Sequence, residues 1–383
     1  MATNLDAIEL TRKLLSFDTI NPPGNEGACA AFLGELLAQA GFQVDYYDFA
    51  PGRSSVVARA GNTDGPRTLC YIGHIDTVPL GKSAWSKDPF GGEIVGDRLY
   101  GRGASDMKAS IAAFVVAAIR RLDALPPDGG LILVLAAGEE TGCEGSLHLA
   151  SLGISLGTLA GVIVGEPTDN YPFVGHKGAL WLKAAIKGVS AHGSMPQAGV
   201  NAVRKGAEVV ARLDNFGADR PPHAVLGAPT INVGTFHGGQ NINSVPDWAE
   251  VGIDIRTTPG MDHHATCNEL AHLLHPHVHD LSVQASMPHV WTDSDHPWVQ
   301  DVFAVVEEVT GVQPGERGAT YFSDASALQQ AINGAPTLIL GPGDPAMAHQ
   351  TDEYCSVARI VEAVTLYEQI MARTWVGQNA VVE

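Results

Sequence analysis

Apolar runs alternate with helix-period patterns along the first part of the chain. The predicted elements are a helix from Leu5, a strand over 54–58, a strand over 68–73, a helix over 107–122 and a strand over 131–137. Strands that are apolar throughout and alternate with helices are typical of a parallel sheet with helices on both faces. The pattern therefore predicts an α/β fold built on a mainly parallel sheet.

The pattern changes near Lys177 to strands that alternate between apolar and polar residues. Such alternation is typical of antiparallel strands with one solvated face, so this part of the chain predicts an α+β domain. Its expected elements are strands over 179–190, 231–239, 248–258 and 281–287 and helices over 199–213 and 261–274.

The first pattern then resumes, with a helix over 297–309 and a buried strand over 336–340. Two stretches of one pattern that enclose a different one indicate an inserted domain. We therefore expect one domain formed by 1–178 and 290–383, into which a domain formed by 179–289 is inserted. A length of 383 residues is consistent with two domains.

Composition narrows the classes of partner. Hydrophobic residues make up 45% of the chain and charged residues 17%, as in ordinary globular proteins. The 42 acidic residues against 23 Lys and Arg give a formal charge of −19, which argues against a nucleic acid or an anionic membrane surface as a partner.

Cysteine usage and the N-terminus suggest a location. The five cysteines are scattered and include no CxxC pair, which indicates reduced thiols and neither a disulfide framework nor a thiolate zinc site. The first residues lack the basic and apolar regions of a signal peptide, and no apolar run reaches the ~18 residues of a membrane span. We expect a soluble, cytoplasmic protein.

Side chains that bind metals or move protons recur where the predicted strands end. They are His74 and Asp76 after the strand 68–73, Glu139 and Glu140 after 131–137, Glu166 after GVIV at 161–164, and His349 after 336–340. Ligands of open α/β sheets gather at the carboxyl ends of the strands. Because His74 and Asp76 lie two residues apart, Asp76 can hold one imidazole nitrogen while the other binds a metal.

Asp106 begins the helix 107–122, and it alone would be explained as a helix N-cap. The nearby Gly101 and Gly103 could also belong to a nucleotide-binding loop. That interpretation is weak because no third glycine follows in GxGxxG register. The strand-end residues favour a metal ligand instead.

Charge counting supports two metal ions. Two divalent cations carry four positive charges, and Asp106, Glu140, Glu166 and a bound hydroxide balance them. With His74 and His349 as one imidazole per metal and Asp106 shared, each ion has three protein ligands, an open arrangement suited to catalytic zinc. Oxygen-rich ligation also admits cobalt or manganese.

The segments GHIDTVP, GRGASDMK, GEETGCEGS, VGEPTD and AHQTDEY, taken in order, resemble the co-catalytic zinc amidohydrolases and exopeptidases. That family includes acetylornithine deacetylase, succinyl-diaminopimelate desuccinylase, aminoacylases and glutamate carboxypeptidase. The resemblance covers essentially the whole chain. Gly138 stands where an Asp is frequent, and Ala109 and Ser110 stand where glycines are, and none of these is a ligand position.

The resemblance implies a zinc-exopeptidase-like sheet and gives each candidate residue a role. His74, Asp106 and Glu166 would hold one zinc, and Asp106, Glu140 and His349 the other. Glu139 would be the general base that acts on a water activated by the two metals, and Asp76 would orient His74. The resemblance also implies a cis peptide bond after Asp106.

Further expectations concern the inserted domain, which the resemblance identifies as a lid and dimerisation domain. His192, in SAHGSMP, would stabilise the oxyanion from the partner subunit of a homodimer. Asn243 and Arg256 match positions that hold the substrate's carboxylate, and Lys177 is expected to line the cleft. The histidines around the helix 261–274 are interpreted as solvated surface. They are His263, His264, His272, His275, His277 and His279.

The ending GPGDPAMAHQTDEY is closest to the acetylornithine deacetylase pattern, and no arginine-rich succinyl-binding segment accompanies Lys177. We therefore expect a deacylase of N-acyl amino acids. The alternatives are a carboxypeptidase acting on short peptides, a desuccinylase, another C–N hydrolase on the same site, and a metal-binding protein without catalysis. The complete ligand set together with Glu139 argues against the last.

Overall fold

The computed structural model describes residues 5–214, 216–217 and 219–376. The chain forms two compact units, each with its own hydrophobic core. Unit 1 comprises residues up to Gly175 together with Trp291–Arg317 and the segment from Ser323 onwards. Unit 2 comprises His176–Val290 and Gly318–Phe322.

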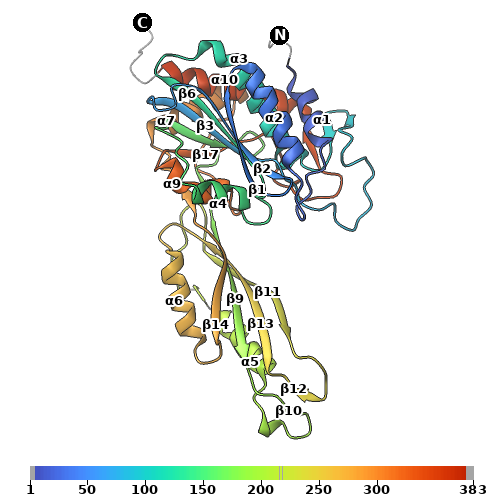
Figure 1. Cartoon of the computed structure of the whole chain (residues 1–383). Helices are drawn as coiled ribbons and strands as arrows, with labels where there is room; N and C mark the ends of the chain where they lie inside the picture. Colours follow the sequence, from blue (N-terminus) through green and yellow to red (C-terminus); the bar gives the residue numbers. More distant parts are fainter. Residues whose placement is uncertain (1–4, 215, 218, 377–383) are drawn as a thin grey trace. The chain divides into compact units, whose positions relative to one another are not determined.

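Unit 1 is built around a six-stranded sheet of order β1-β2-β6-β3-β7-β17 (Figure 1). The strands are β1 (Gln43–Ala50), β2 (Arg53–Gly61), β3 (Arg67–His74), β6 (Gly129–Ala136), β7 (Gly161–Val164) and β17 (Thr337–Ile339). The pairs β6–β3, β3–β7 and β7–β17 are parallel, whereas β1–β2 and β2–β6 are antiparallel. The four parallel neighbours therefore bring their carboxyl ends to one edge of the sheet.

Helices cover both faces of this sheet. They are α1 (Ala7–Leu15), α2 (Gly27–Ala40), α3 (Ala109–Arg121), α4 (Glu144–Ser151), α7 (Pro297–Thr310), α8 (Asp324–Ala327), α9 (Gln329–Ile332) and α10 (Val357–Val376). One large core cluster joins α1, α2, α3, α7 and α10 to alternate strand residues such as Leu69, Tyr71 and Leu133. The intervening residues Cys70 and Ile72 are equally buried, as expected for strands covered on both sides.

Unit 2 is an antiparallel sheet of order β11-β13-β9-β14 that packs against two helices. The strands are β9 (Gly178–Lys187), β11 (Thr230–Gly238), β13 (Trp248–Thr257) and β14 (Asp280–Met287), and the helices are α5 (Ala202–Leu213) and α6 (His263–Leu274). Asn201 caps α5 and Asp262 caps α6, each accepting a backbone N–H of the first turn. Apolar residues of β9 and β13 alternate toward the helices and form the core.

Short strands complete the structure. Unit 2 contains a two-stranded ribbon of β10 (Ala191–His192) and β12 (Ser244–Val245), and unit 1 contains a sheet of β4 (Ile94–Val95), β5 (Arg98–Tyr100) and β18 (Tyr354–Ser356). The strands β8 (Gly175–His176), β15 (Val290–Trp291) and β16 (Gly318–Ala319) lie where the chain passes between units. Among the described residues, no helix is both long and apolar enough to cross a membrane.

Candidate metal centre

The candidate site residues lie at one edge of the unit 1 sheet, at or after the carboxyl ends of four parallel strands. His74 is the last residue of β3, Glu139 and Glu140 follow β6, Glu166 follows β7, and His349 lies in the loop after β17. Because β6, β3, β7 and β17 are neighbours in the sheet, residues from distant parts of the chain meet here.

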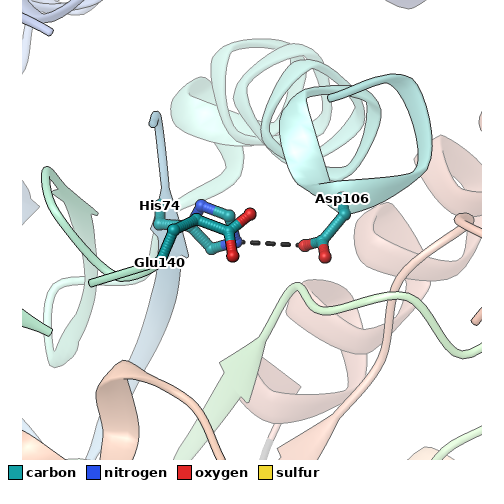
Figure 2. A group of neighbouring side chains, drawn as sticks. All are labelled: His74, Asp106 and Glu140. Carbon is teal, nitrogen blue, oxygen red and sulfur yellow. Dashed lines mark hydrogen bonds and ion pairs between the residues drawn. The ribbon is translucent and has the colours of Figure 1, made fainter. Parts of the chain in front are cut away.

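Asp106 lies between two imidazoles. Its Oδ1 is 3.1 Å from Nε2 of His74, and its Oδ2 is 3.3 Å from Nε2 of His349. Figure 2 shows the Asp106 carboxylate directed at His74, with Glu140 beside it. The backbone at Asp106 is not helical (φ −121°, ψ 89°), and the Asp106–Met107 peptide bond is cis, as the resemblance implies. One carboxylate with an oxygen toward each imidazole is suited to bridge two cations.

The donor set fits divalent metals. Ligand atoms of His74, Asp106 and Glu140 all lie within 4.8 Å of one another. Glu140 places Oε2 3.1 Å from Nε2 of His349, while its buried Oε1 has no hydrogen-bond partner. Oε2 of Glu166 is 3.8 Å from Nε2 of His74. A buried oxygen without a partner is costly, and a metal ion would satisfy it.

Asp76 connects His74 to the glutamate pair. Nδ1 of His74 lies 3.1 Å from the backbone oxygen of Asp76 and 3.5 Å from its carboxylate. The same carboxylate accepts the backbone N–H groups of Glu139 (3.1 Å) and Glu140 (3.2 Å) and the side-chain amide of Asn21 (2.9 Å). Asp76 therefore fixes the backbone of both glutamates as well as the ring of His74.

Glu139 is one of the carboxyl groups in this cluster that favour a bound proton. Its side chain is buried, and the thiol of Cys143 lies 3.9 Å from Oε1 as a weak donor. Burial raises the pKa of Glu139 well above its usual range, and the negative charges of Glu166 and Glu140 raise it further, although His74 opposes this. A carboxyl group with a raised pKa can both accept and return a proton near neutral pH.

Without metal, the predicted ligand residues favour their protonated forms. Burial raises the pKa of Glu166 well above its usual range and also raises that of Glu140. Burial opposes protonation of His74, but hydrogen bonds to Asp106 and Asp76 raise its pKa well above normal. Hydrogen bonds to Asp106 and Glu140 raise the pKa of His349 to about 10. Metal binding has to displace these protons.

The thermal stabilisation produced by zinc is therefore expected to increase from pH 6 to pH 8. Groups whose folded pKa is raised stabilise the metal-free fold at low pH and lose this contribution as pH rises through the folded pKa, which is about 10 for His349. Zinc binding releases these protons, and proton release becomes easier as pH rises. For each proton released, the free energy by which zinc stabilises the fold therefore grows by about 1.4 kcal/mol per pH unit. Melting curves with and without zinc, at constant free zinc concentration, measure this difference; a difference that stays constant with pH would contradict the assignment.

The remaining predicted site residues lie in unit 2. Pairing of β10 with β12 sets His192 opposite Ser244, and the N–H of Gly193 bonds to the backbone oxygen of Asn243, so His192 and Asn243 are near each other. Arg256 and Lys177 form a second group, in which burial and the charge of Arg256 lower the pKa of Lys177.

Sequence reasoning missed several buried residues around the site, among them Asn21 and Glu353. The side-chain amide of Asn21 donates to Asp76 and to Thr141. Glu353 accepts the backbone N–H of Asp106 at 3.0 Å, although it lies inside the motif AHQTDEY. The sequence signal that could have identified Glu353 is an acidic residue four positions after the predicted ligand His349. For Asn21 the sequence offers only the NPPG turn in which it stands.

Comparison with known sequences identifies relatives over nearly the full length. A model of peptidase family M20/M25/M40 matches residues 70–373. Acetylornithine deacetylase from Proteus mirabilis is 31% identical, with 97% of this chain and 98% of that protein aligned. Acetylornithine deacetylase from Vibrio vulnificus is 29% identical, with 96% and 98% aligned.

Solved structures share the fold. An M20 family metallo-carboxypeptidase from Sulfolobus solfataricus superposes with a TM-score of 0.84 at 19% identity, covering 97% of this chain and all (100%) of that one. A dinuclear metal binding peptidase of the M20 family from Bacillus subtilis gives a TM-score of 0.68 at 14% identity, covering 95% and 96%. The predicted α/β fold with its inserted α+β part is confirmed.

Proposed function

Because the chain belongs to peptidase family M20/M25/M40 and is a metal-dependent amide hydrolase, we propose that it removes the acyl group from an N-acyl amino acid, as a deacetylase of the acetylornithine type. The central support is the position of Asp106, with one carboxylate oxygen toward each of two histidines, beside the buried Glu139. Full-length similarity to acetylornithine deacetylases supports the choice of substrate class.

We propose two divalent metals, and the mixed histidine and carboxylate ligands favour zinc. His74, Asp106 and Glu166 would hold one ion, and Asp106, Glu140 and His349 the other. When bound, such ions polarise the amide carbonyl and lower the pKa of water toward neutrality. Cobalt or manganese would use the same ligands.

Glu139 performs the proton transfers. As general base it takes a proton from the attacking water, and as general acid it returns that proton to the nitrogen of the departing amine. Its side chain is buried, which keeps the transferred proton away from bulk water between these two steps. Asp76 keeps the Glu139 backbone fixed during the transfer.

His192 is the proposed donor to the oxyanion. Its Nδ1 accepts the backbone N–H of Ser194 at 3.2 Å, which leaves Nε2 as the ring nitrogen that can donate. An Nε2–H is a hydrogen-bond donor suited to the negative oxygen that develops as water adds to the carbonyl.

Arg256 is the proposed anchor for the substrate's carboxylate, together with Asn243 and Lys177. Asp254 lies 3.0 Å from Nε of Arg256 and also accepts the indole N–H of Trp181, which holds the guanidinium in place. Lys177 is a second cation of this group: burial lowers its pKa and the charge of Arg256 lowers it further, while its Nζ donates to the backbone oxygen of Ala228. The excess positive charge favours an anionic substrate group.

We propose that the protein is a homodimer that pairs through unit 2. β11 forms one edge of the four-stranded sheet, and most of its residues are exposed, including Phe236. The segments next to the β10–β12 ribbon expose Met195 and Ile242. An exposed strand edge with apolar side chains is a surface that a second copy of the chain would cover.

The cysteines support the proposed cytoplasmic location. Cys29, Cys70, Cys143, Cys267 and Cys355 all keep free thiols, and four of them are buried. Unpaired cysteines are the usual pattern in reducing compartments.

A substrate panel tests the proposed function. With zinc-, cobalt- and manganese-loaded protein, we expect kcat/KM for N-acetylornithine to exceed that for acyl-glutamates and dipeptides by at least about 100-fold. A difference of about 100-fold is within the discrimination that a single extra or missing methylene group in a binding pocket produces. Preferential turnover of dipeptides would instead assign a carboxypeptidase, and turnover of N-succinyl substrates a desuccinylase. The metal-free protein serves as the control.

A further inference from the structure

We propose that Glu353 is a positioning residue that joins the loop of Asp106 to the loop of His349, and so sets the spacing of the ligands they provide. This inference rests on the proposed metal centre. Glu353 is completely buried, and it lies four positions after His349 in the chain. Its contacts reach the segment 102–106, about 250 residues earlier in the sequence.

All four donors around Glu353 come from this earlier segment. Oε1 accepts the backbone N–H groups of Ser105 (2.8 Å) and Asp106 (3.0 Å). Oε2 accepts the N–H of Gly103 (3.0 Å) and Nη1 of the buried Arg102 (2.6 Å). A carboxylate has about four lone-pair sites and no donor, so it matches this set of four donors.

The backbone of the segment explains why an external acceptor is needed. Gly103 has a left-handed conformation (φ 86°), and Asp106 is not helical. The donors at Gly103, Ser105 and Asp106 therefore lie before the regular hydrogen bonds of α3 begin. Glu353 supplies an acceptor at the point where buried N–H groups would otherwise be unpaired.

Neighbouring contacts hold the same two segments together. The hydroxyl of Ser105 donates to the backbone oxygen of Tyr354 at 2.9 Å and accepts the N–H of Asp344 at 3.0 Å. The N–H of Gly101 bonds to the backbone oxygen of Glu353. Glu353 is thus the charged centre of a seam between the two loops.

Each of the two loops joined by this seam carries one predicted metal ligand. Asp106 receives its backbone restraint from Glu353 and directs Oδ2 at His349, 3.3 Å away. His349 has a left-handed backbone (φ 63°), a conformation that surrounding contacts have to maintain. A displaced Glu353 would let the Asp106 and His349 loops separate and would widen the distance between their ligand atoms.

The test is metal binding by the full chain with Glu353→Gln. The amide group cannot accept at both ends, so it loses the acceptor either for the N–H groups of Ser105 and Asp106 or for the N–H of Gly103 together with Arg102. We expect zinc affinity, measured by competition with a chromophoric chelator, to fall about 10- to 100-fold. The visible spectrum of the cobalt-loaded variant should also change, because that spectrum reports ligand geometry.

Glu26→Gln is the matched control. Glu26 is also completely buried and paired with an arginine, Arg53, at 2.8 Å, but it makes no hydrogen bond to a ligand loop. Its substitution should lower thermal stability and leave zinc affinity and the cobalt spectrum within about twofold of the unmodified chain. Equal zinc affinity in the Glu26→Gln and Glu353→Gln variants would overturn the proposal.

Glu353→Asp gives a second measurement if the glutamine variant does not fold. It keeps the charge but withdraws the carboxylate by one methylene, so zinc affinity should again fall while the chain stays folded. An unchanged affinity and cobalt spectrum in this variant would also overturn the role of Glu353. Absence of zinc binding by the unmodified chain would be a separate result, since it would refute the metal centre itself.

Discussion

Replacement of Glu139 by glutamine is expected to lower kcat about 1000-fold and to leave the metal content unchanged. Glutamine has the size of glutamate but cannot take a proton from water, and general acid–base groups contribute about 10²–10⁴-fold to rate. The Glu139 carboxylate is buried beside the ligands, while Glu140 has the contact with His349. Activity assays and metal analysis of the same preparation measure the two effects.

The adjacent residue provides the control for this experiment. Glu140→Gln should lose metal as well as activity, because Glu140 and His349 lie at the same proposed ion. Two neighbouring, chemically identical substitutions are thus expected to give different metal contents. Full activity in Glu139→Gln, or loss of metal from it, would show that Glu139 is not the base.

The Glu139→Gln variant can also test whether each active site uses residues from both subunits. If His192 acts in the partner subunit, a heterodimer of Glu139→Gln and His192→Ala protomers contains one site with both residues intact. Two-tag purification of the co-expressed heterodimer should then give about half the activity of the unmodified dimer per molecule. An inactive heterodimer would place His192 in the same subunit as the Glu139 it serves.

Replacement of Asp106 by asparagine is expected to abolish measurable turnover and to remove at least one of the two metals. Asparagine keeps the shape of aspartate but removes the negative charge between His74 and His349, and it turns an NH₂ toward one of them. We expect zinc affinity to fall by more than the ~100-fold that groups outside the ligand set cause. Metal analysis after dialysis and titration of zinc measure the loss.

Asp169→Asn is the control for the Asp106 variant. Asp169 is a half-exposed carboxylate paired with Arg359 at 2.9 Å, so its substitution should leave metal content unchanged. Two tightly bound metals in Asp106→Asn would show that this carboxylate does not bridge the ions.

The predicted ligand residues can be identified from the sequence because their positions follow from the strand pattern. The apolar runs that become β3 and β6 end at His74 and just before Glu139, and parallel pairing brings these ends together. At these positions, side chains that can bind metals stand where the apolar strand pattern ends. The sequence alone is therefore enough to predict that these side chains lie close together.

Other features depend on contacts that no local pattern reveals. Asn21 reaches Asp76 across 55 positions, and Glu353 reaches Arg102 across 251. β1 is another example, because the polar, half-exposed sequence QVDYYDFA pairs only with β2 at the sheet edge and lacks clear alternation. Tertiary pairing determines such elements, and local preference contributes little.

The hydrogen bonds of Asp76 limit how this centre can be redesigned. Its carboxylate accepts the N–H groups of two consecutive residues, Glu139 and Glu140. A change that moves Glu140 to accommodate a larger cation would therefore also move Glu139, the proposed general base. Substitutions at these three positions should combine non-additively, and a change of metal preference would need compensating changes selected together.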